Sequence, residues 1–178
     1  GAGWNGAASP VVTCVVAAPG ICAVRNFIHR HYPPGTWVLS VDDDVADILE
    51  KVDAKRTQTI LSLHAFVEIA FQIAEKENCK IWGLNPVLNP FMMDRNYSLD
   101  LRFVIACFFG FFSDPQAQDL EVRATPKDDF ERTILYYRKY GRLLRFNGVA
   151  AKTNYARTAG GLQLTRTLQK ERDCVAYL

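Results

Sequence analysis

WVLSVDDD, residues 37–44, places three consecutive aspartates directly after a short, mostly apolar run. The run 37–41 is rich in β-branched and large apolar residues, which predicts a strand. The aspartates then stand at the carboxyl end of that strand, where α/β sheets bind their ligands. The segment therefore predicts an α/β fold with a charged site at one edge of the sheet.

Sequence patterns on both sides of this segment alternate between strand and helix. Residues 10–17, PVVTCVVA, form the continuous β-branched run that is expected of a strand buried on both faces. Helical spacing of apolar residues, with Ser62, Thr125-Pro126 and Gly141 as boundaries, predicts helices over 21–31, 62–78 and 125–140. Short apolar runs predict further strands over 80–84, 103–112 and 142–149. The pattern predicts one sheet flanked by helices.

The composition fits a single soluble domain. The chain has 178 residues, of which 49% are hydrophobic and 22% charged, enough for a core that needs no covalent cross-link. The formal net charge of +2 produces no global field that would commit the protein to nucleic acid or to a membrane. We expect a flexible start over 1–9, one domain over 10–165 and a C-terminal tail over 166–178.

Cysteine usage and hydropathy predict an intracellular protein without a membrane segment. The five cysteines form no C-x-x-C pair, and several lie in apolar runs where a thiol packs as a small hydrophobic group. The longest apolar run, 103–112, has about half of the roughly 20 residues that cross a bilayer. We therefore expect a reducing compartment, cytoplasmic or nuclear.

Asp42, Asp43 and Asp44 form the cluster with the clearest chemical meaning. Adjacent carboxylates repel one another, and a bound cation relieves that repulsion. Strand geometry predicts that Asp42 and Asp44 point to the same side, where two carboxylates suit Mn²⁺ or Mg²⁺. Such a metal can bridge two phosphates and stabilise a departing nucleotide diphosphate. The alternative is a solvated acidic turn that caps a helix over 45–52.

A second acidic cluster, KDDFE at 127–131, begins the predicted helix over 125–140. Asp129 could take a proton from an acceptor hydroxyl while Asp128 or Glu131 orients the substrate, as general-base catalysis requires. The alternative is purely structural, because acidic side chains at a helix N-terminus stabilise the helix dipole. In that alternative Thr125 caps the helix and Asp128 takes the matching capping-box position.

Polar residues elsewhere are candidates for contacts with a nucleotide. Arg25 and Asn26 interrupt an apolar helix and could bind a ribose or a phosphate, or pair with the aspartate cluster. Arg145, Asn147 and Lys152 lie in or after the last predicted strand, where basic and amide groups can neutralise a leaving diphosphate. Ordinary surface charge is the alternative for this second group.

Several other chemistries lack their sequence signatures. His29, His31 and His64 have no Cys or His at metal-ligand spacing, so we expect them in the core or on helix surfaces. The sequence contains no G-x-S-x-G, P-loop or G-x-G-x-x-G motif. Serine hydrolase, P-loop ATPase and Rossmann dehydrogenase functions are therefore unsupported.

Read together, these motifs resemble those of the GT-A-type glycosyltransferases. PGICAVRNFI followed by WVLSVDDDV resembles the family's Arg-Asn helix and its strand ending in D-x-D. FVIACFFGFF resembles the central strand before the acceptor site, and KDDFERTILYYRKYG the acidic helix start. SVDDDV, IWGLNP, DDFERTILYYRKYGRLLRFNGVAAKTNY and GGLQ are, more narrowly, similar to the glycosyltransferases associated with TET/JBP oxygenases, the group of the base J enzyme.

The resemblance implies a single GT-A-like, Rossmann-like mixed sheet flanked by helices, with Mn²⁺ or Mg²⁺ and a nucleotide sugar, UDP-sugar above all, as cofactor and donor. It implies that Asp42 and Asp44 are metal and diphosphate ligands within the donor motif Asp42–Asp44. Asp129 would be the base, with Asp128 and Glu131 beside it. Arg25 and Asn26 would face the donor, and Arg145, Asn147 and Lys152 would close over its phosphates. Two features depart from the family pattern. No histidine follows His64 to act as a late third metal ligand, and the usual opening strand and helix are short or missing.

The leading hypothesis is a metal-dependent, inverting hexosyltransferase that moves a sugar to an acceptor hydroxyl. The narrower resemblance implies a hydroxymethylated pyrimidine in DNA as acceptor. One alternative is a catalytically inactive GT-A-like domain that binds nucleic acid or a protein. Another is a metal-dependent nucleotidyltransferase, which would release pyrophosphate rather than a nucleoside diphosphate.

Overall fold

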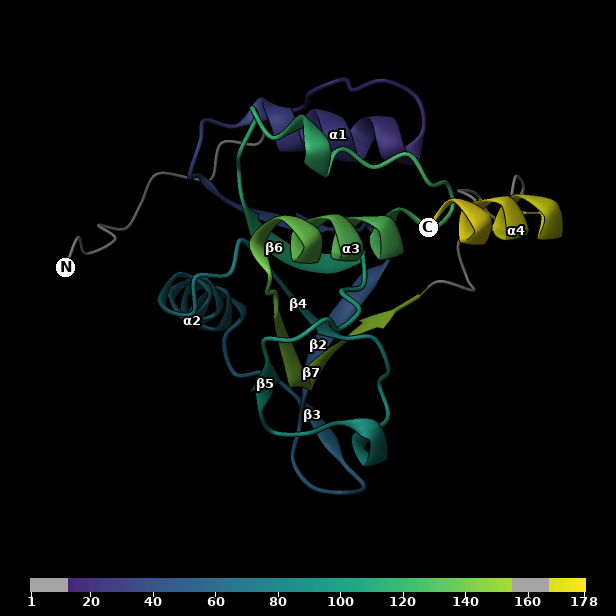
Figure 1. Cartoon of the computed structure of the whole chain (residues 1–178). Helices are drawn as coiled ribbons and strands as arrows, with labels where there is room; N and C mark the ends of the chain where they lie inside the picture. The colour runs from purple at the N-terminus through teal and green to yellow at the C-terminus, as the bar shows by residue number, and fades with distance from the viewer. Residues whose placement is uncertain (1–12, 155–166) are drawn as a thin grey trace.

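The computed structural model describes residues 13–154 and 167–178, which form a mixed α/β fold (Figure 1). The elements, in chain order, are α1 (Ile21–His31), β1 (Trp37–Val41), β2 (Val45–Lys51), β3 (Thr57–Thr59), α2 (Leu63–Lys76), β4 (Ile81–Asn85), the 3-10 helix η1 (Pro90–Met92), β5 (Tyr97–Ser98), β6 (Phe108–Phe112), the 3-10 helix η2 (Gln118–Leu120), α3 (Asp128–Tyr140), β7 (Leu144–Thr153) and α4 (Leu168–Tyr177).

Most of the predicted elements are confirmed, and local chemistry explains their ends. Ser62 caps α2, its side chain accepting a hydrogen bond from the Ala65 amide at 3.2 Å. Asn78 follows that helix with a positive φ of 53°, a conformation that Asn tolerates. Gly141 ends α3 in the left-handed conformation with φ 72°.

Three predictions about these elements are wrong, and so is the helix over 45–52 that belonged to the alternative interpretation of the aspartates. Residues 13–17 form no strand and are mostly exposed, with Val16 96% exposed, while 10–12 lie outside the described residues. The segment after the aspartates is strand β2, not a helix, because it pairs with both β7 and β3. The strand predicted over 103–112 begins only at Phe108. Helix α3 begins at Asp128, with Lys127 at the cap position, and the Thr125–Pro126 bond before it is cis.

The structure describes only part of the predicted division of the chain into start, domain and tail. The expected flexible start over 1–9 lies outside the described residues, as do 155–166. The expected C-terminal tail contains the helix α4, whose N-cap Thr167 accepts a hydrogen bond from the Lys170 amide at 3.2 Å. Among the described residues, no helix combines the length and the apolar character that crossing a bilayer requires.

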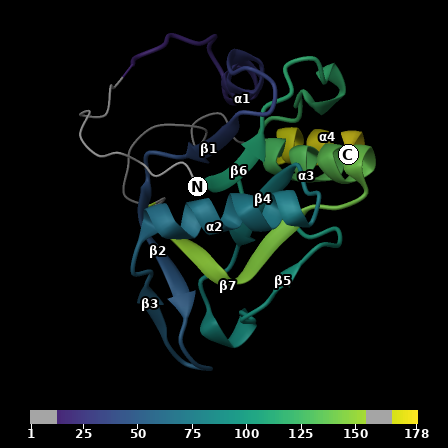
Figure 2. The same ribbon diagram turned by 90° about the vertical axis from the view of Figure 1, so that its left-hand side faces the viewer.

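The seven strands form one curled mixed sheet with the order β1-β6-β4-β7-β2-β3, and β5 pairs with β7. Helix α2 covers one face, and α1 and α3 cover the other (Figures 1 and 2). Strand β6 shows why the centre is buried on both sides. Phe108 and Phe112 pack into the core beneath α2, whereas Phe109 and Phe111 pack into the core beneath α1 and α3.

The short connection between β1 and β2 requires the sheet to curl. Three residues join these strands, so Val41 and Val45 can be at most about 14 Å apart. In the sheet order, however, β6, β4 and β7 lie between β1 and β2, which amounts to about 19 Å in a flat sheet. The curl brings the two strand ends together and places the aspartates at the junction.

Strand β7 bends in the middle, as the V-shaped ribbon beneath α2 shows (Figure 2). Its first half pairs with β4 and β5, its second half pairs with β2, and the register shifts between the two halves. Gly148 lies at the bend, where a Cβ would come within 2.6 Å of the Asp94 carbonyl oxygen. Glycine thus allows the 94–96 backbone to pack against the bend.

Gly110 is expected to be intolerant of any side chain. A Cβ there would lie 2.2 Å from Nε1 of Trp82, which is fully buried. Gly110→Ala should reduce the free energy of unfolding by about 1–3 kcal/mol, measured by urea denaturation. In a Trp82→Phe background, the same substitution should cost less. An equal cost in both backgrounds would contradict this packing account.

Candidate functional site

The aspartate cluster lies in a tight turn between β1 and β2, not on the strand itself. The Asp42 amide donates to the Cys107 carbonyl at 2.9 Å, and the Asn154 amide donates to the Asp44 carbonyl at 2.9 Å. The alternation of side chains along a strand therefore does not set the directions of Asp42 and Asp44. The turn is instead held from both sides by the entry to β6 and the exit from β7.

Asp44 is the carboxylate of this turn that is hardest to ionise in its surroundings. The pKa of Asp44 is raised, first by burial and then by the negative charges of Asp42 and Asp43. The side chain of Asp42 is 35% exposed and Asp43 is exposed, so the turn is accessible from solvent. A cation bound here would relieve the repulsion.

Arg25 connects the acidic turn to the interior. Its side chain is only 8% exposed, and its guanidinium donates to Asp42 Oδ1 at 2.6 Å and to Ser40 Oγ at 2.9 Å. Its Nε lies 3.8 Å from Asp128 Oδ2 on α3. The pairing of Arg25 with the aspartate cluster, one of the two roles considered from the sequence, is thus present.

Asp128 and Arg132 continue this row of charges into the core. Asp128 Oδ2 accepts a hydrogen bond from Arg132 at 2.9 Å, and both side chains are less than 8% exposed. The Arg132 guanidinium lies over the Phe109 ring, 4.2 Å from its centroid. Asp42, Arg25, Asp128 and Arg132 therefore alternate in sign from the surface turn to the buried face of α3.

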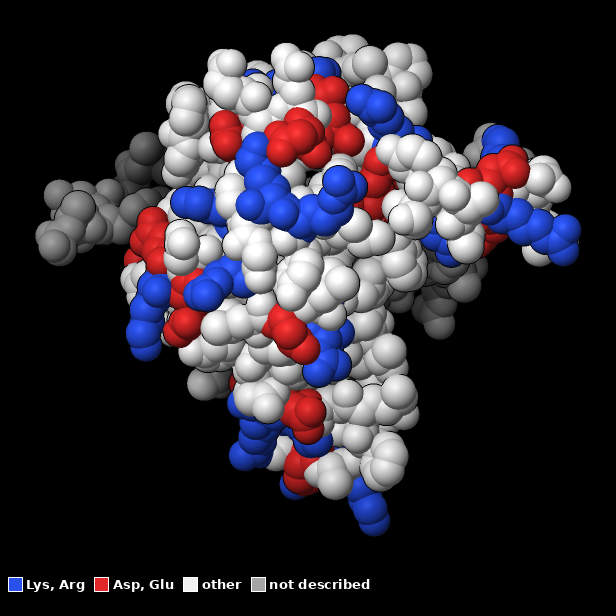
Figure 3. All heavy atoms as spheres, in the orientation of Figure 1, with Lys and Arg blue, Asp and Glu red and all other residues white. Residues whose placement is uncertain are grey.

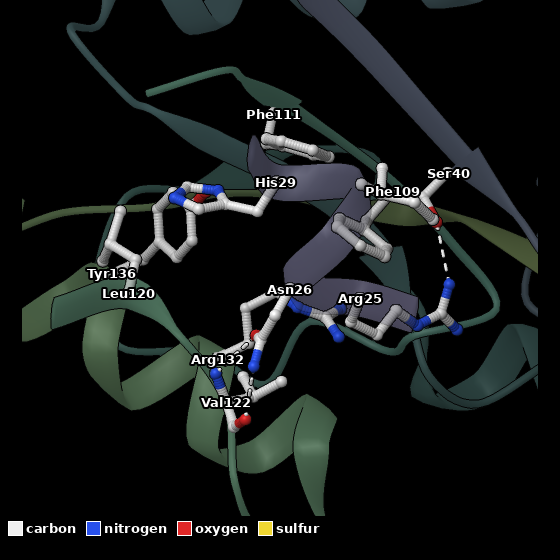
Figure 4. Close-up of a pocket in the computed structure, with 11 residues that line it drawn as sticks. Arg25, Asn26, His29, Ser40, Phe109, Phe111, Leu120, Val122, Arg132 and Tyr136 are labelled. Carbon is white, nitrogen blue, oxygen red and sulfur yellow. Dashed lines mark hydrogen bonds between the residues drawn. The ribbon is translucent and has the colours of Figure 1, made fainter. Parts of the chain in front are cut away.

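A small cavity lies on the buried side of Arg25, between α1, β6 and α3 (Figure 4). Its volume is about 20 Å³, room for a water molecule but not for a nucleotide. Three lining side chains have a buried nitrogen that finds no hydrogen-bond partner among the described residues: Arg25 Nε, Arg132 NH1 and His29 Nε2. Burial lowers the pKa of His29, which favours the neutral ring. A ligand larger than water would have to bind outside this cavity.

Asp129, at the start of α3, has a raised pKa and a backbone amide as a hydrogen-bond partner. Its Oδ1 accepts a hydrogen bond from the Phe130 amide at 2.9 Å. Its pKa is raised, first by burial and then by the adjacent charge of Asp128. A carboxylate with a raised pKa in a partly buried site is the type of group that serves as a general base.

Asp128 and Glu131 have protein partners instead of an open position for substrate. Asp128 lies between two guanidinium groups, as described above. Glu131 is 3% exposed, and its Oε2 accepts hydrogen bonds from the amides of Arg123 at 2.5 Å and Ala124 at 2.7 Å. Its Oε1 accepts a third from Tyr177 of α4 at 2.8 Å. These two carboxylates hold neighbouring segments in place.

Asn26 also has a structural partner instead of facing the acidic turn. Its side-chain amide donates to the Val122 carbonyl at 2.9 Å and accepts from the Val122 amide at 2.9 Å. This pair of hydrogen bonds fixes α1 to the segment before α3 in the way that a strand partner would. Asn26 thereby supports the position of Arg25, its neighbour on the helix.

The three candidates from the last strand separate into two places. Lys152 is exposed near the end of β7, where it lies opposite Asp47 on β2. Two residues later, the Asn154 amide donates the hydrogen bond to the Asp44 carbonyl. Arg145 and Asn147 lie in the other half of β7. Arg145 donates to Asn147 Oδ1 at 2.8 Å, and Asn147 donates to Asn96 Oδ1 at 2.9 Å. Lys152 therefore adjoins the acidic turn, and the other two do not.

Arg132 and Ser40 are the site residues that sequence reasoning missed. Both lie in segments whose helix or strand pattern was recognised, but each was counted only as part of that pattern. Arg132 follows Asp128 by four residues, a spacing at which opposite charges pair on a helix. That spacing was the available signal. Nothing in the sequence indicated the hydrogen bond from Arg25 to Ser40.

The described residues supply only part of a metal coordination shell. Within 13–154 and 167–178, no group of three or more His, Cys, Asp or Glu side chains is arranged to hold a metal ion. The acidic turn offers Asp42 and Asp44. Mg²⁺ is commonly held by one or two carboxylates together with substrate phosphates and water. The turn thus suits a metal that binds together with a diphosphate.

Asp128→Asn is expected to destabilise the fold strongly. The substitution leaves Arg25 and Arg132 close together without the buried negative charge between them. Breaking such a buried pair should cost about 3–5 kcal/mol in urea denaturation at neutral pH. Asp129→Asn is the matched control and should cost little, because the folded state already disfavours the charged form of Asp129. Equal losses in the two variants would contradict the charge arrangement.

The sequence comparisons and the structural comparison leave the function to be argued from this geometry. The chain matches no protein-family model, no curated protein sequence and no solved structure.

Proposed function

We propose that the protein is a metal-dependent glycosyltransferase with a GT-A-like fold that uses a nucleotide sugar, preferably a UDP-sugar, as donor. The observation that supports it most is the link from Asp42 to Asp128 through Arg25, because it places the acidic turn and the start of α3 side by side. A transferase of this kind needs two neighbouring groups: one that binds the leaving diphosphate and one that deprotonates the acceptor. The acidic turn suits the first role and Asp129 the second.

Each residue near the turn has a defined task in this proposal. Asp42 and Asp44 would hold Mn²⁺ or Mg²⁺, which when bound neutralises the charge of the leaving diphosphate. Arg25 keeps Asp42 in place, and exposed Lys152 supplies positive charge beside the turn. Asp129 accepts the proton of the acceptor hydroxyl as the new glycosidic bond forms on the opposite face of the sugar, giving inversion. Asp128 and Glu131 position the helix that carries Asp129.

The acceptor proposed from the narrower family resemblance is a hydroxymethylated pyrimidine in DNA. Its primary hydroxyl is weakly acidic, so a general base contributes to the transfer. Release of a nucleoside diphosphate would distinguish this reaction from nucleotidyl transfer, which releases pyrophosphate. The first activity screen is therefore nucleoside-diphosphate release from UDP-sugars and GDP-sugars with Mn²⁺, with and without hydroxymethylated DNA.

Asp44→Asn should abolish sugar transfer while leaving the protein folded. The substitution removes a carboxylate proposed to bind the metal, and it also removes one of three adjacent negative charges, so the fold should not be weakened. Asp43→Asn is the matched control in the same turn and should retain most of the activity. The readouts are nucleoside-diphosphate release and thermal unfolding. Full activity of folded Asp44→Asn would overturn the proposed role of the turn.

The pH dependence of transfer should report Asp129. As a base, Asp129 works only when deprotonated, so kcat/KM should fall as the pH drops through its pKa. Because burial and Asp128 raise that pKa, the acid limb should lie above the range of an ordinary aspartate. Asp129→Asn should lose most of the activity and also lose this limb. An unchanged limb in the residual activity of Asp129→Asn would assign it to another group.

A further inference from the structure

The acidic turn lies at the start of β2, and a second set of exposed groups lies at the opposite end of that strand. The proposed reaction does not use these groups. They belong to the β2–β3 turn, residues 52–56, and to the loop 86–96 with η1, which together we call the tip. Both segments lie together at the lower end in Figure 1. The side chain of Lys51 bonds the Met93 carbonyl, which joins the two segments.

The loop of the tip displays two large apolar side chains on a rigid frame. Phe91 is 83% exposed and Met92 is 63% exposed. Asn89 Oδ1 accepts from the Phe91 amide at 3.1 Å, and the Asn89 carbonyl accepts from the Met92 amide at 2.8 Å. The next residue, Met93, is fully buried and anchors the loop. A preorganised loop that exposes apolar side chains is typical of an interaction surface.

Cations border these apolar side chains. Lys55 and Arg95 are exposed, and neither side chain forms an ion pair with any described residue. Arg56 is also exposed but pairs with Asp53 at 2.7 Å. Figure 3 shows basic side chains at this lower end, together with some acidic ones and uncharged surface. The Lys55 and Arg95 side chains beside the exposed Phe91 and Met92 suit a ligand that offers both phosphates and stacked, apolar rings.

A groove of about 500 Å³ adjoins the tip and is lined by residues of β2, β3, β5 and β7 and of the loop before β5. Its walls carry the ring of Tyr97, the amide of Asn96 and the cations Lys51 and Arg95, together with Glu50, which accepts a hydrogen bond from the Gln58 amide at 2.8 Å. Aromatic rings stack on bases, amides bond base edges, and cations bind phosphates. The groove therefore offers the same chemistry as the loop beside it.

We propose that the tip binds a DNA duplex, with Phe91 and Met92 as an apolar wedge against the bases and Lys55 and Arg95 on the phosphates. Wedges of Phe or Met between base steps, flanked by basic side chains, are a known mode of duplex binding. The inference rests on the proposed function for its choice of DNA. It adds to that function a binding surface separate from the reacting groups.

The length of β2 relates this surface to the acidic turn. The strand runs from Val45, beside the turn, to Lys51, beside the loop, a span of about 20 Å at ordinary strand rise. The same span equals about six base-pair steps of a duplex. A duplex held at the tip would therefore present a nucleotide several steps away to the reacting groups.

The test measures binding of a fluorescently labelled DNA duplex by fluorescence anisotropy over a range of salt concentrations. A duplex of about 20 base pairs is long enough, since it is roughly three times as long as the distance from the tip to the acidic turn. Phe91→Ala/Met92→Ala should weaken binding roughly tenfold while leaving the salt dependence unchanged. Lys55→Ala/Arg95→Ala should weaken binding and reduce the slope of log K against log salt by about 1 for each phosphate that is no longer bound. Thermal unfolding confirms that each variant is folded.

Matched controls lie far from the tip. Leu168→Ala/Val175→Ala removes exposed apolar side chains from α4, and Arg138→Ala/Arg172→Ala removes two exposed cations from α3 and α4. Both controls should bind the duplex like the wild type. Equal weakening by a control and its matched tip variant would overturn the proposal, since binding would then be a general surface effect.

Binding of UDP-sugar with Mn²⁺, measured on the same proteins, separates this inference from the proposed function. Donor binding by the wild type without duplex binding would overturn the tip proposal alone. Duplex binding that depends on Phe91 and Lys55, without donor binding, would leave the tip proposal standing and contradict the transferase. If Phe91→Ala/Met92→Ala instead abolished binding to anionic lipid vesicles, and no duplex bound, the tip would be a membrane surface.

Discussion

The row Asp42, Arg25, Asp128 and Arg132 is the interaction on which the candidate site depends. Each charge in the row has an opposite charge beside it, which makes burial of two guanidinium groups and a carboxylate tolerable. The row ties three separate elements together: the turn after β1, the helix α1 and the first turn of α3. Together with the hydrogen bonds between Asn26 and Val122, it fixes the acidic turn relative to the start of α3.

The sheet supplies the frame for that row. Its curl brings the end of β1 to the start of β2, and the backbone bonds of Asp42 and Asp44 fix the turn to β6 and β7. The segment before α3 is held by Asn26 from one side and by Glu131 and Tyr177 from the other. These contacts hold the backbone of both segments, whereas the carboxylates of Asp44 and Asp129 form no ion pair with any described residue.

Helices α1, α2 and α3 and most strands were predictable because their apolar periodicity and end residues agree with the final packing. The strand β2 was not, since VADILEK carries three charges and only its pairing with β7 and β3 makes it a strand. Residues 13–17 have the pattern of a buried strand, but the structure gives them no strand partner among the residues it describes. Local sequence cannot reveal which segments will pair across the sheet.

The site was predictable as a set of residue types, but not as a set of contacts. The aspartate triplet, Arg25 and Asp129 were identified from their spacing, and the structure places the first two in direct contact. The partners of Asn26 and Asn147 were not predictable, because Val122 and Asn96 are brought to them by the tertiary fold. Polar side chains near a strand end can equally well bind a ligand or brace a loop.

Isothermal titration of UDP-glucose into the wild-type protein, with and without Mn²⁺, tests the central claim most directly. The account predicts saturable binding that is much tighter with Mn²⁺, because the two carboxylates of the turn complete a metal site only together with the diphosphate. Absence of binding in both conditions, repeated with UDP-GlcNAc and a GDP-sugar, would contradict a nucleotide-sugar site at the acidic turn.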